Sequence, residues 1–221
     1  MKTIAIIPAR GKSVRLPNKN IKLLEQFPLL VHSIKYAQKH DFIDDIYVTT
    51  NDEDIKNISL QFGAQVIDRP QELSGDLEPT VTALKHVLEC IKEQVENVII
   101  LQPTNPLRPK GMLTEAFRIF ENNKYNSLFT VSRSYQKFGT INNDIFEPVN
   151  YIIGERSQDL KPLFYENGLL YISKAINILN KLIITENAFP YLIAHPFGQI
   201  DIDTQEDFDL AEFMLKKYPN D

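Results

Sequence analysis

Short apolar runs and amphipathic stretches alternate along the first 132 residues of the chain. Residues 97–101 are almost continuously apolar, which is typical of a strand buried on both faces of a sheet. Residues 80–91 instead carry apolar side chains at the three- and four-residue spacing of one helix face. Strands are expected at residues 3–7, 45–50, 64–67, 97–101 and 127–132, and helices at 29–39, 52–62, 80–91 and 111–121. This alternation predicts an α/β fold in which helices cover both faces of a mostly parallel central sheet.

The pattern changes after Ser132. Residues 135–164 are rich in Asn, Gly, Pro and aromatic side chains, which predicts hairpins and loops that form a small lobe. A strand is expected again at 169–173, a helix at 175–182, a last strand end at 199–203, and a final helix through about residue 216. Thr204 with Asp207 three positions later resembles a capping box that would start this helix. We therefore expect one domain over residues 1–221, with a lobe of about 133–190 inserted before the last strand and helix.

Composition narrows the function classes. The 221 residues include 43% hydrophobic side chains, enough for a sizeable core, and the net charge of −5 argues against general nucleic-acid binding. Cys90 is the single cysteine and is expected to pack within a helix, so no disulfide framework is predicted. No apolar run approaches a membrane span, and the short first strand does not fit a signal peptide. These features predict a cytoplasmic protein with no membrane partner.

A basic loop follows the first strand and stands out on this acidic chain. It carries the four cations Arg10, Lys12, Arg15 and Lys19, with Gly11 supplying conformational freedom. In open α/β sheets, ligands lie beyond the carboxyl ends of the strands. A loop of this kind at that place is suited to a triphosphate, although it matches neither a Walker A motif nor a Rossmann fingerprint. The alternative is a solvated basic loop.

The second informative pattern is Asp201-Ile202-Asp203 near the end of the chain. In a strand, residues two apart point to the same side, and two carboxylates there repel unless a cation lies between them. Mg²⁺ prefers oxygen ligands and often combines one or two carboxylates with substrate phosphates. We therefore expect Mg²⁺ (or Mn²⁺) at Asp201 and Asp203. The alternative is an acidic turn in which Asp203 only caps the following helix.

Three further polar segments are expected near the same sheet edge. Gln102 and Thr104 follow a buried strand in a loop fixed by prolines, which suits a hydroxyl-rich or carboxylated substrate. The segment from Arg69 to Thr80 offers hydrogen bonds for a ribose or a base. Residues 165–171 enter a late strand and carry an Asn-Gly turn. Each has a purely structural alternative, and the four histidines show no metal-ligand spacing.

Taken together, these segments resemble the acylneuraminate cytidylyltransferase family, the CMP-sialic acid synthetases and their relatives. The match runs nearly end to end. The residues that carry it are Pro8-Ala9-Arg10-Gly11, Ser13, Pro17-Asn18-Lys19-Asn20, Val48-Thr49-Thr50, Arg69-Pro70, Glu72-Leu73, the segment 101–108, Glu166-Asn167-Gly168, Tyr171 and Asp201-Ile202-Asp203-Thr204.

The resemblance implies a Rossmann-like nucleotide-transferase fold and transfer of CMP from CTP to the anomeric hydroxyl of a nonulosonic acid, with N-acetylneuraminate favoured and pyrophosphate released. It also implies a homodimer whose small lobe reaches toward the partner's active site. The implied catalytic residues are Lys19, Arg10, Asp201 and Asp203. The implied triphosphate and nucleotide ligands are Arg10, Gly11, Ser13, Lys19, Asn20, Arg69 and Thr80. The implied acid-sugar ligands are Gln102, Asn167, Tyr171 and Arg156, and the implied metal ligands are Asp201 and Asp203.

The chain departs from the family pattern at three positions. Lys12 replaces a usual glycine, Val14 replaces a usual lysine, and Asn51 stands where an acidic residue is common. Lys12 is a candidate for restoring the lost cation. Alternatives that the residues leave open are the same reaction on legionaminic, pseudaminic or deaminated neuraminic acid or Kdo, an Asp-x-Asp metal-dependent glycosyltransferase, and a non-catalytic nucleotide-binding protein.

Overall fold

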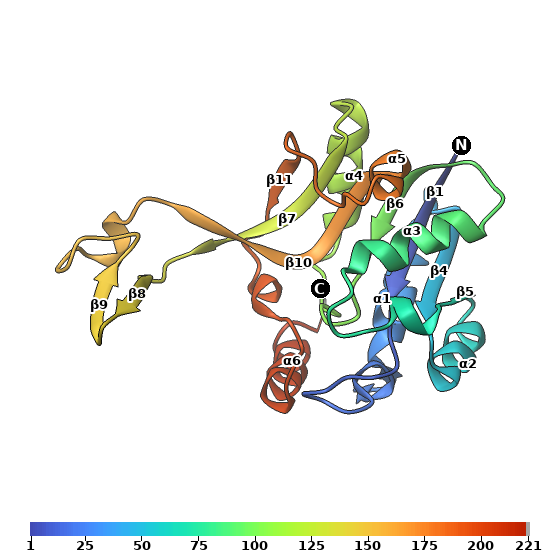
Figure 1. The fold of residues 1–221 in the computed structure, drawn as a ribbon, viewed down its shortest axis with the longest axis horizontal. Helices are drawn as coiled ribbons and strands as arrows, with labels where there is room; N and C mark the ends of the chain where they lie inside the picture. The colour runs from blue at the N-terminus through green and yellow to red at the C-terminus, as the bar shows by residue number, and fades with distance from the viewer. Residues whose placement is uncertain (220–221) are drawn as a thin grey trace.

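The computed structural model describes residues 1–219 and is built on a seven-stranded sheet (Figure 1). The strand order is β11-β7-β10-β6-β1-β4-β5. The bounds of these strands are β1 Lys2–Pro8, β4 Asp45–Thr50, β5 Gln65–Asp68, β6 Val95–Ile100, β7 Ser127–Ser134, β10 Leu163–Lys174 and β11 Phe189–Leu192. The five strands expected before residue 133 are confirmed to within a few residues at their ends.

The sheet is mostly parallel, as predicted. Strands β6, β1, β4 and β5 run parallel to one another, and β11 is parallel to β7. The exception is β10, which is antiparallel to both β6 and β7. Because the parallel strands share one direction, their carboxyl ends meet along one edge, where the loops after β1, β4, β5 and β6 converge.

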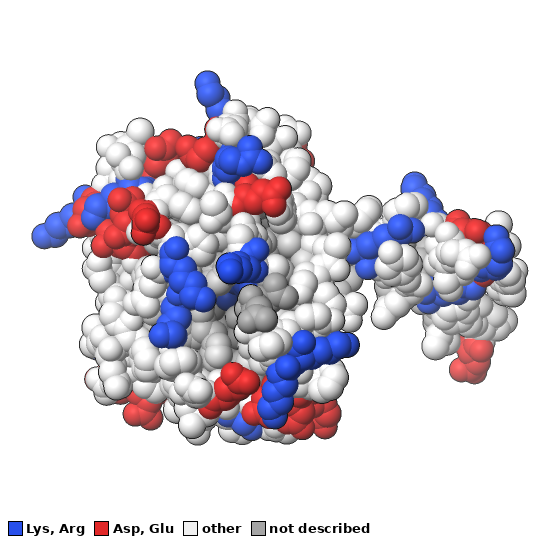
Figure 2. Space-filling model, turned by 180° about the vertical axis from the view of Figure 1, so that it is seen from behind, with Lys and Arg blue, Asp and Glu red and all other residues white. Residues whose placement is uncertain are grey.

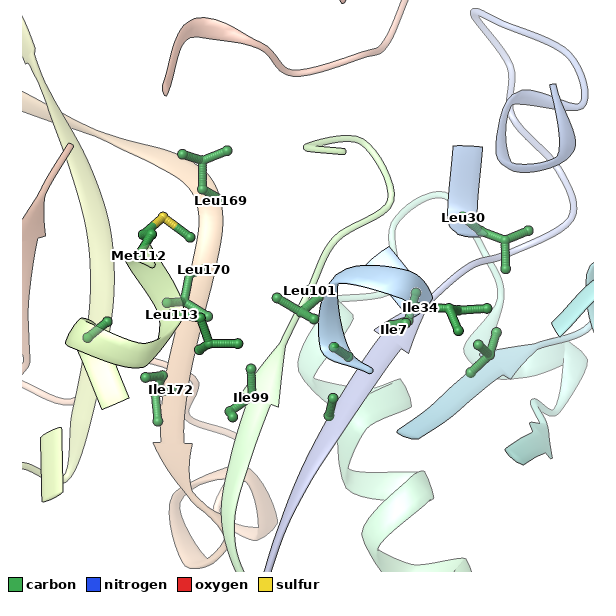
Figure 3. Close-up of a cluster of buried hydrophobic side chains, with 14 of the residues drawn as sticks. Ile7, Leu30, Ile34, Ile99, Leu101, Met112, Leu113, Leu169, Leu170 and Ile172 are labelled. Atoms are coloured by element: carbon green, nitrogen blue, oxygen red, sulfur yellow. The ribbon is translucent and has the colours of Figure 1, made fainter. Parts of the chain in front are cut away.

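Helices cover both faces of the sheet, which confirms the three-layer architecture (Figure 1). Alternate side chains of β1 enter different cores, Ile7 toward one face and Ile6 toward the other. Figure 3 shows Ile7 in the first core, among side chains from neighbouring strands and from two of the covering helices. The first core involves α1 (Leu29–Ala37), α2 (Glu53–Gln61) and α4 (Met112–Asn122), and the second involves α3 (Thr80–Cys90) and α5 (Ala175–Leu179).

The last helix, α6 (Gln205–Lys217), builds a third apolar cluster with the loop after β1. Its Phe208 packs with Leu16, and both are nearly inaccessible to solvent. The capping box predicted at its start is present: Thr204 and Asp207 exchange side-chain-to-backbone hydrogen bonds. The C-terminal helix therefore holds the basic loop and the Asp201–Asp203 segment in one packed unit.

A narrow arm leaves the main body between β7 and β10 (Figures 1 and 2). It contains a separate two-stranded sheet of β8 (Gly139–Asn142) and β9 (Ile145–Pro148), followed by the 3-10 turn η3 (Ser157–Asp159). The lobe expected at 133–190 therefore proves smaller, because β10, α5 and β11 belong to the main body.

Two local expectations are wrong. Residues 199–203 do not form a strand: Gln199 is the last residue of the 3-10 turn η4 (Pro196–Gln199), and Ile202 donates a single backbone hydrogen bond, to the Thr104 carbonyl. Cys90 is exposed rather than packed, because it lies at the very end of α3, where the apolar stripe ends. The remaining short elements are η1 (Lys19–Ile21), β2 (Leu23–Leu24), β3 (Phe27–Pro28) and η2 (Gln71–Leu73).

Candidate functional site

A polar cavity of about 340 Å³ opens at the carboxyl edge of the parallel strands. The loops after β1, β5 and β6 all contribute to its wall, together with Asp203 from the segment before α6. The predicted site residues that line it are Arg10, Ser13, Lys19, Asn20, Arg69, Thr80, Gln102 and Asp203. The fold thus brings together most of the nucleotide-site residues expected from the sequence.

Close packing fixes the start of the basic loop. The Gly11 amide donates to Asn51 Oδ1 at 3.1 Å, and a Cβ on Gly11 would lie 2.6 Å from the Cβ of Asp52. Asp52 itself caps α2 by accepting from the Ile55 amide at 3.0 Å. Asn20 donates to the Arg10 carbonyl at 2.9 Å and holds the loop from the other side. Asn51, a departure from the family pattern, therefore supports the loop through its amide.

Two arginines form one wall of the cavity. Arg10 donates to the Gly75 carbonyl at 3.0 Å and lies 2.8 Å from the Asp76 carboxylate. Arg69 is buried and donates to the Thr49 carbonyl at 2.7 Å. Burial, with the nearby Arg10 charge as a smaller cause, lowers the pKa of Arg69 to about 10. Arg69 stays charged at neutral pH and faces the cavity without a carboxylate partner of its own in the part of the chain described here.

The opposite wall joins the basic loop to the acidic segment. Lys19 is buried, and its ammonium donates to the Ile202 carbonyl at 2.7 Å and to Asp203 Oδ1 at 2.8 Å. Arg15 pairs with the other oxygen, Oδ2, of the same carboxylate. Asp207 accepts from the Asp203 amide at 3.0 Å and so orients the backbone of this segment. Asp203 is thus held between two cations at the cavity surface.

Asp201 lies close enough to Asp203 for their charges to interact. Loss of part of its hydration raises the pKa of the Asp201 carboxyl, Asp203 adds to the rise, and a hydrogen bond from Thr104 opposes it. Asp203 lines the first cavity and Asp201 lines neither, but the two carboxylates together supply oxygen ligands of the kind that Mg²⁺ prefers, so the donor set fits a hard cation. Among residues 1–219, no group of three or more His, Cys, Asp or Glu side chains is arranged to hold a metal ion.

A second cavity of about 380 Å³ adjoins the first, and both are lined by Pro79, Thr80 and Gln102. Its wall is partly apolar, with Ile183 and Ile184, and partly polar, with Glu166 and Tyr171. Arg108 is buried beneath the Gln102 loop and donates to the Gln102 carbonyl at 2.9 Å, which fixes the loop. Burial lowers the pKa of Arg108 to about 10. Gln102 is therefore held between the two cavities.

An irregularity in β10 places Glu166 and Tyr171 together. The β10–β7 register shifts between these two residues, and the Tyr171 hydroxyl donates to Glu166 Oε1 at 2.5 Å. Burial and the Glu166 carboxylate raise the pKa of Tyr171 well above its ordinary value, so the hydroxyl remains a donor.

The structure leaves two predicted acid-sugar ligands outside these cavities. Asn167 is buried, and its amide already bonds to Ser132 Oγ at 2.9 Å and to the Leu169 amide at 3.2 Å. Arg156 lies on the arm, where it pairs with Asp159 at 2.6 Å. Lys12, the candidate replacement cation, does not line either cavity.

Arg15, Asp76 and Glu166 all line the cavities, although the sequence indicated them only as members of polar segments and not as individual site residues. Arg15 was visible as a cation of the basic loop, and Glu166 as part of the Glu-Asn-Gly segment. Their partners, Asp203 and Tyr171, could be identified only from the fold.

The chain matches the cytidylyltransferase family over residues 4–220 and belongs to it. It is 33% identical over 216 residues to an N-acylneuraminate cytidylyltransferase of Streptococcus agalactiae serotype V, a match that covers 94% of this chain and 52% of that protein. It is 31% identical over 227 residues to the CMP-N,N'-diacetyllegionaminic acid synthase of Legionella pneumophila, covering 98% of this chain and 97% of the relative. The family resemblance seen in the sequence is thereby confirmed.

The chain spans about half the length of the first curated relatives it matches, at 52%. A solved structure of a CMP:2-keto-3-deoxy-manno-octonic acid synthetase complexed with CTP shares the fold, with a TM-score of 0.74, 16% identity and coverage of 98% of this chain and 99% of that one. None of the helices within residues 1–219 is both long and apolar enough to cross a membrane.

Proposed function

We propose that this protein transfers CMP from CTP to the anomeric hydroxyl of a nonulosonic acid and releases pyrophosphate, with N-acetylneuraminate as the first candidate. The observation that carries the proposal is the cavity in which Arg10, Lys19 and Asp203 meet, directly beside a second cavity that shares Gln102. One cavity suits a triphosphate and the other suits a partly apolar, hydroxyl-rich acid. The two relatives named above act on acids of this class.

In the proposed reaction, the anomeric oxygen attacks the α-phosphorus of CTP and the bond to pyrophosphate breaks. Arg10, Ser13 and Lys19 hold the triphosphate and offset the charge that builds on it. Gly11 lets the loop approach closely, while Asn20, Arg69 and Thr80 contact the cytidine. Gln102 and Tyr171 hold the acid sugar, so that most of the catalysis comes from positioning the two reactants.

Asp201 and Asp203 would hold Mg²⁺ or Mn²⁺ together with phosphate oxygens. When bound, such an ion stabilises phosphate charge and lowers the pKa of a coordinated hydroxyl. The nearness of the Asp201 and Asp203 carboxylates, whose oxygens are hard ligands, supports this assignment.

The arm supports a homodimer. Its exposed apolar side chains include Ile141, Ile145, Phe146 and Ile152, and none of them belongs to the three buried apolar clusters described within residues 1–219. A second copy that covers the arm would also bring Arg156 toward the partner's acid-sugar cavity. A guanidinium there would pair with the substrate carboxylate. A cytoplasmic location remains the prediction made from the sequence.

The alternative substrates and functions are not equally well supported. Legionaminic acid remains an alternative substrate, because the relative of that name matches over nearly its whole length. Pseudaminic acid also remains one, because a pseudaminic acid cytidylyltransferase of Campylobacter jejuni is 29% identical and is covered over 97% of its length. Membership of the cytidylyltransferase family disfavours a glycosyltransferase. A non-catalytic nucleotide-binding protein would bind CTP without turnover.

The test is pyrophosphate release from CTP and Mg²⁺ with N-acetylneuraminate, its deaminated analogue, legionaminate, pseudaminate and Kdo in parallel. We expect release with at least one acid sugar and none with Asp203→Asn. Tight CTP binding without release for any sugar would overturn the proposal.

A further inference from the structure

Two cations neutralise the single negative charge of Asp203. Its two oxygens pair separately with Lys19 and with Arg15. The Lys19 side chain is 11% exposed and is also tied to the Ile202 carbonyl, whereas the Arg15 side chain is 66% exposed. Within residues 1–219, Asp203 accepts the one hydrogen bond that the Arg15 guanidinium donates. Of the two cations, Arg15 is therefore the one that can leave.

A divalent cation and the Arg15 guanidinium compete for the same carboxylate. Arg15 opposes metal coordination at Asp203 because its positive charge repels a cation beside Oδ2 and its N–H group already uses one of the lone pairs of that oxygen. The competing position for Arg15 is close by, since it lines the same cavity as Arg10, Ser13 and Lys19. A planar guanidinium pairs as well with phosphate oxygens as with a carboxylate.

Among its neighbours in the basic loop, Arg15 is best placed to supply a positive charge to the triphosphate. Val14, which replaces the usual lysine of the family, is 76% exposed and lines the cavity with an apolar side chain. Lys12 is exposed and lies outside the cavity wall. Arg15, one position after Val14, is thus the residue that can restore the missing charge at the phosphates.

We propose that Arg15 pairs with Asp203 in the empty enzyme and moves to the triphosphate when CTP binds, which frees Asp203 for the divalent cation. This inference rests on the proposed function. It makes nucleotide binding and metal binding support each other, because each favours the state in which the Arg15–Asp203 ion pair is broken. The ion pair also weakens metal binding until the nucleotide arrives.

The test compares Arg15→Ala with Lys12→Ala, which removes the same charge from the same loop but outside the cavity. Mn²⁺ binding is measured without nucleotide by electron paramagnetic resonance of the free ion. CTP binding is measured separately by calorimetry with EDTA present. For Arg15→Ala we expect Mn²⁺ affinity to rise about fivefold or more and CTP affinity to fall about tenfold or more. Lys12→Ala should change each affinity less than about twofold.

Opposite changes in the two affinities, seen in Arg15→Ala alone, would support the proposal. Unchanged Mn²⁺ affinity in Arg15→Ala, or equal effects of the two variants, would overturn it. Arg15→Gln, which keeps the side-chain volume, should repeat the Arg15→Ala result and excludes a packing effect. Failure of the wild-type protein to bind CTP would remove the proposed function, whereas the nucleotide-free Mn²⁺ comparison would still report on the ion pair.

Discussion

The Lys19 ammonium lies 2.8 Å from the Asp203 carboxylate, although the two residues are 184 positions apart in the chain. A second hydrogen bond, to the Ile202 carbonyl at 2.7 Å, fixes the direction of the lysine side chain. The basic loop after the first strand and the acidic segment before the last helix therefore form one site.

Replacing Lys19 with Met should disable this site without unfolding the protein. The variant keeps the buried stem but loses the charge that faces both the triphosphate and Asp203. We expect kcat/KM for CTP to fall about 100-fold or more, as when a charge-stabilising donor is removed. Steady-state pyrophosphate release measures it, with the exposed Lys39→Ala as control. A loss below about fivefold would contradict the assigned role.

Gly11→Ala tests the close approach of the basic loop to α2. The new methyl group would lie 2.6 Å from Asp52, so either the loop or this helix cap must move. We expect a loss of stability of about 1 kcal/mol, the usual value of an N-cap, together with weaker CTP binding. Gly75→Ala is the control for stability, since its nearest contact would be an ordinary 3.7 Å. Equal unfolding free energies for Gly11→Ala and wild type would refute this account.

The sequence predicted helices and strands better than it predicted which segments pack against each other. The apolar run at 97–101 and the helical stripe at 80–91 each depend on nearby residues, and both appear as β6 and α3. The strand expected at residues 199–203 is wrong. Ile200 and Ile202 have the alternating spacing of a strand, but their side chains pack in a cluster with α6 and not against a sheet.

Site residues that directly follow a parallel strand could be predicted from the sequence. Contacts between residues far apart in the sequence could not. Arg10 and Arg69 lie where parallel strands end, so their convergence follows from fold class. The Arg15–Asp203 pair and the buried amide of Asn167 depend on packing between distant segments. Propensity and spacing carry no information about such contacts.

Asn105→Ala tests how the Gln102 loop is connected to the segment before Asp201. The buried Asn105 amide donates to the Asn167 carbonyl at 3.1 Å and to the Ile200 carbonyl at 2.8 Å. Two buried acceptors would lose their donor, which should cost about 2 kcal/mol in unfolding free energy. Urea denaturation measures the change, and the exposed Asn123→Ala should stay within about 0.5 kcal/mol of wild type. A small effect at Asn105 would show that water replaces its hydrogen bonds.

Tyr171 should make the fold sensitive to high pH. Burial and the Glu166 carboxylate raise the pKa of the Tyr171 hydroxyl in the folded state above the value of about 10 in the unfolded chain. The protonated hydroxyl therefore contributes its full stabilisation below about pH 10, and this stabilisation is lost as the pH rises further. Tyr171→Phe should therefore lose less stability than wild type between about pH 10 and 11, by at most about 1.4 kcal/mol. Denaturation curves at the two pH values give the difference, with the exposed Tyr135→Phe as control. Identical losses in wild type and Tyr171→Phe would contradict the buried hydrogen bond.

The double substitution Ile141→Asp and Ile145→Asp should separate the proposed dimer. Both side chains are exposed on the arm, at 74% and 64%, and a charge there opposes burial against a second copy. Sedimentation should show wild type as a dimer and the double variant as a monomer with much weaker acid-sugar binding. Leu60→Asp, on the surface of α2, is the control and should remain dimeric. A monomeric wild type with full activity would exclude the role assigned to the arm and to Arg156.

The central claim is that the acid sugar's own oxygen attacks the α-phosphorus of CTP. The most direct measurement uses an acid sugar labelled with ¹⁸O at the anomeric hydroxyl, incubated with CTP, Mg²⁺ and the enzyme, and follows the products by ³¹P NMR. We expect the isotope shift on the CMP-sugar phosphorus, since the labelled oxygen becomes the bridging atom, and none on pyrophosphate. An unlabelled CMP product, or label in pyrophosphate, would contradict the proposed reaction.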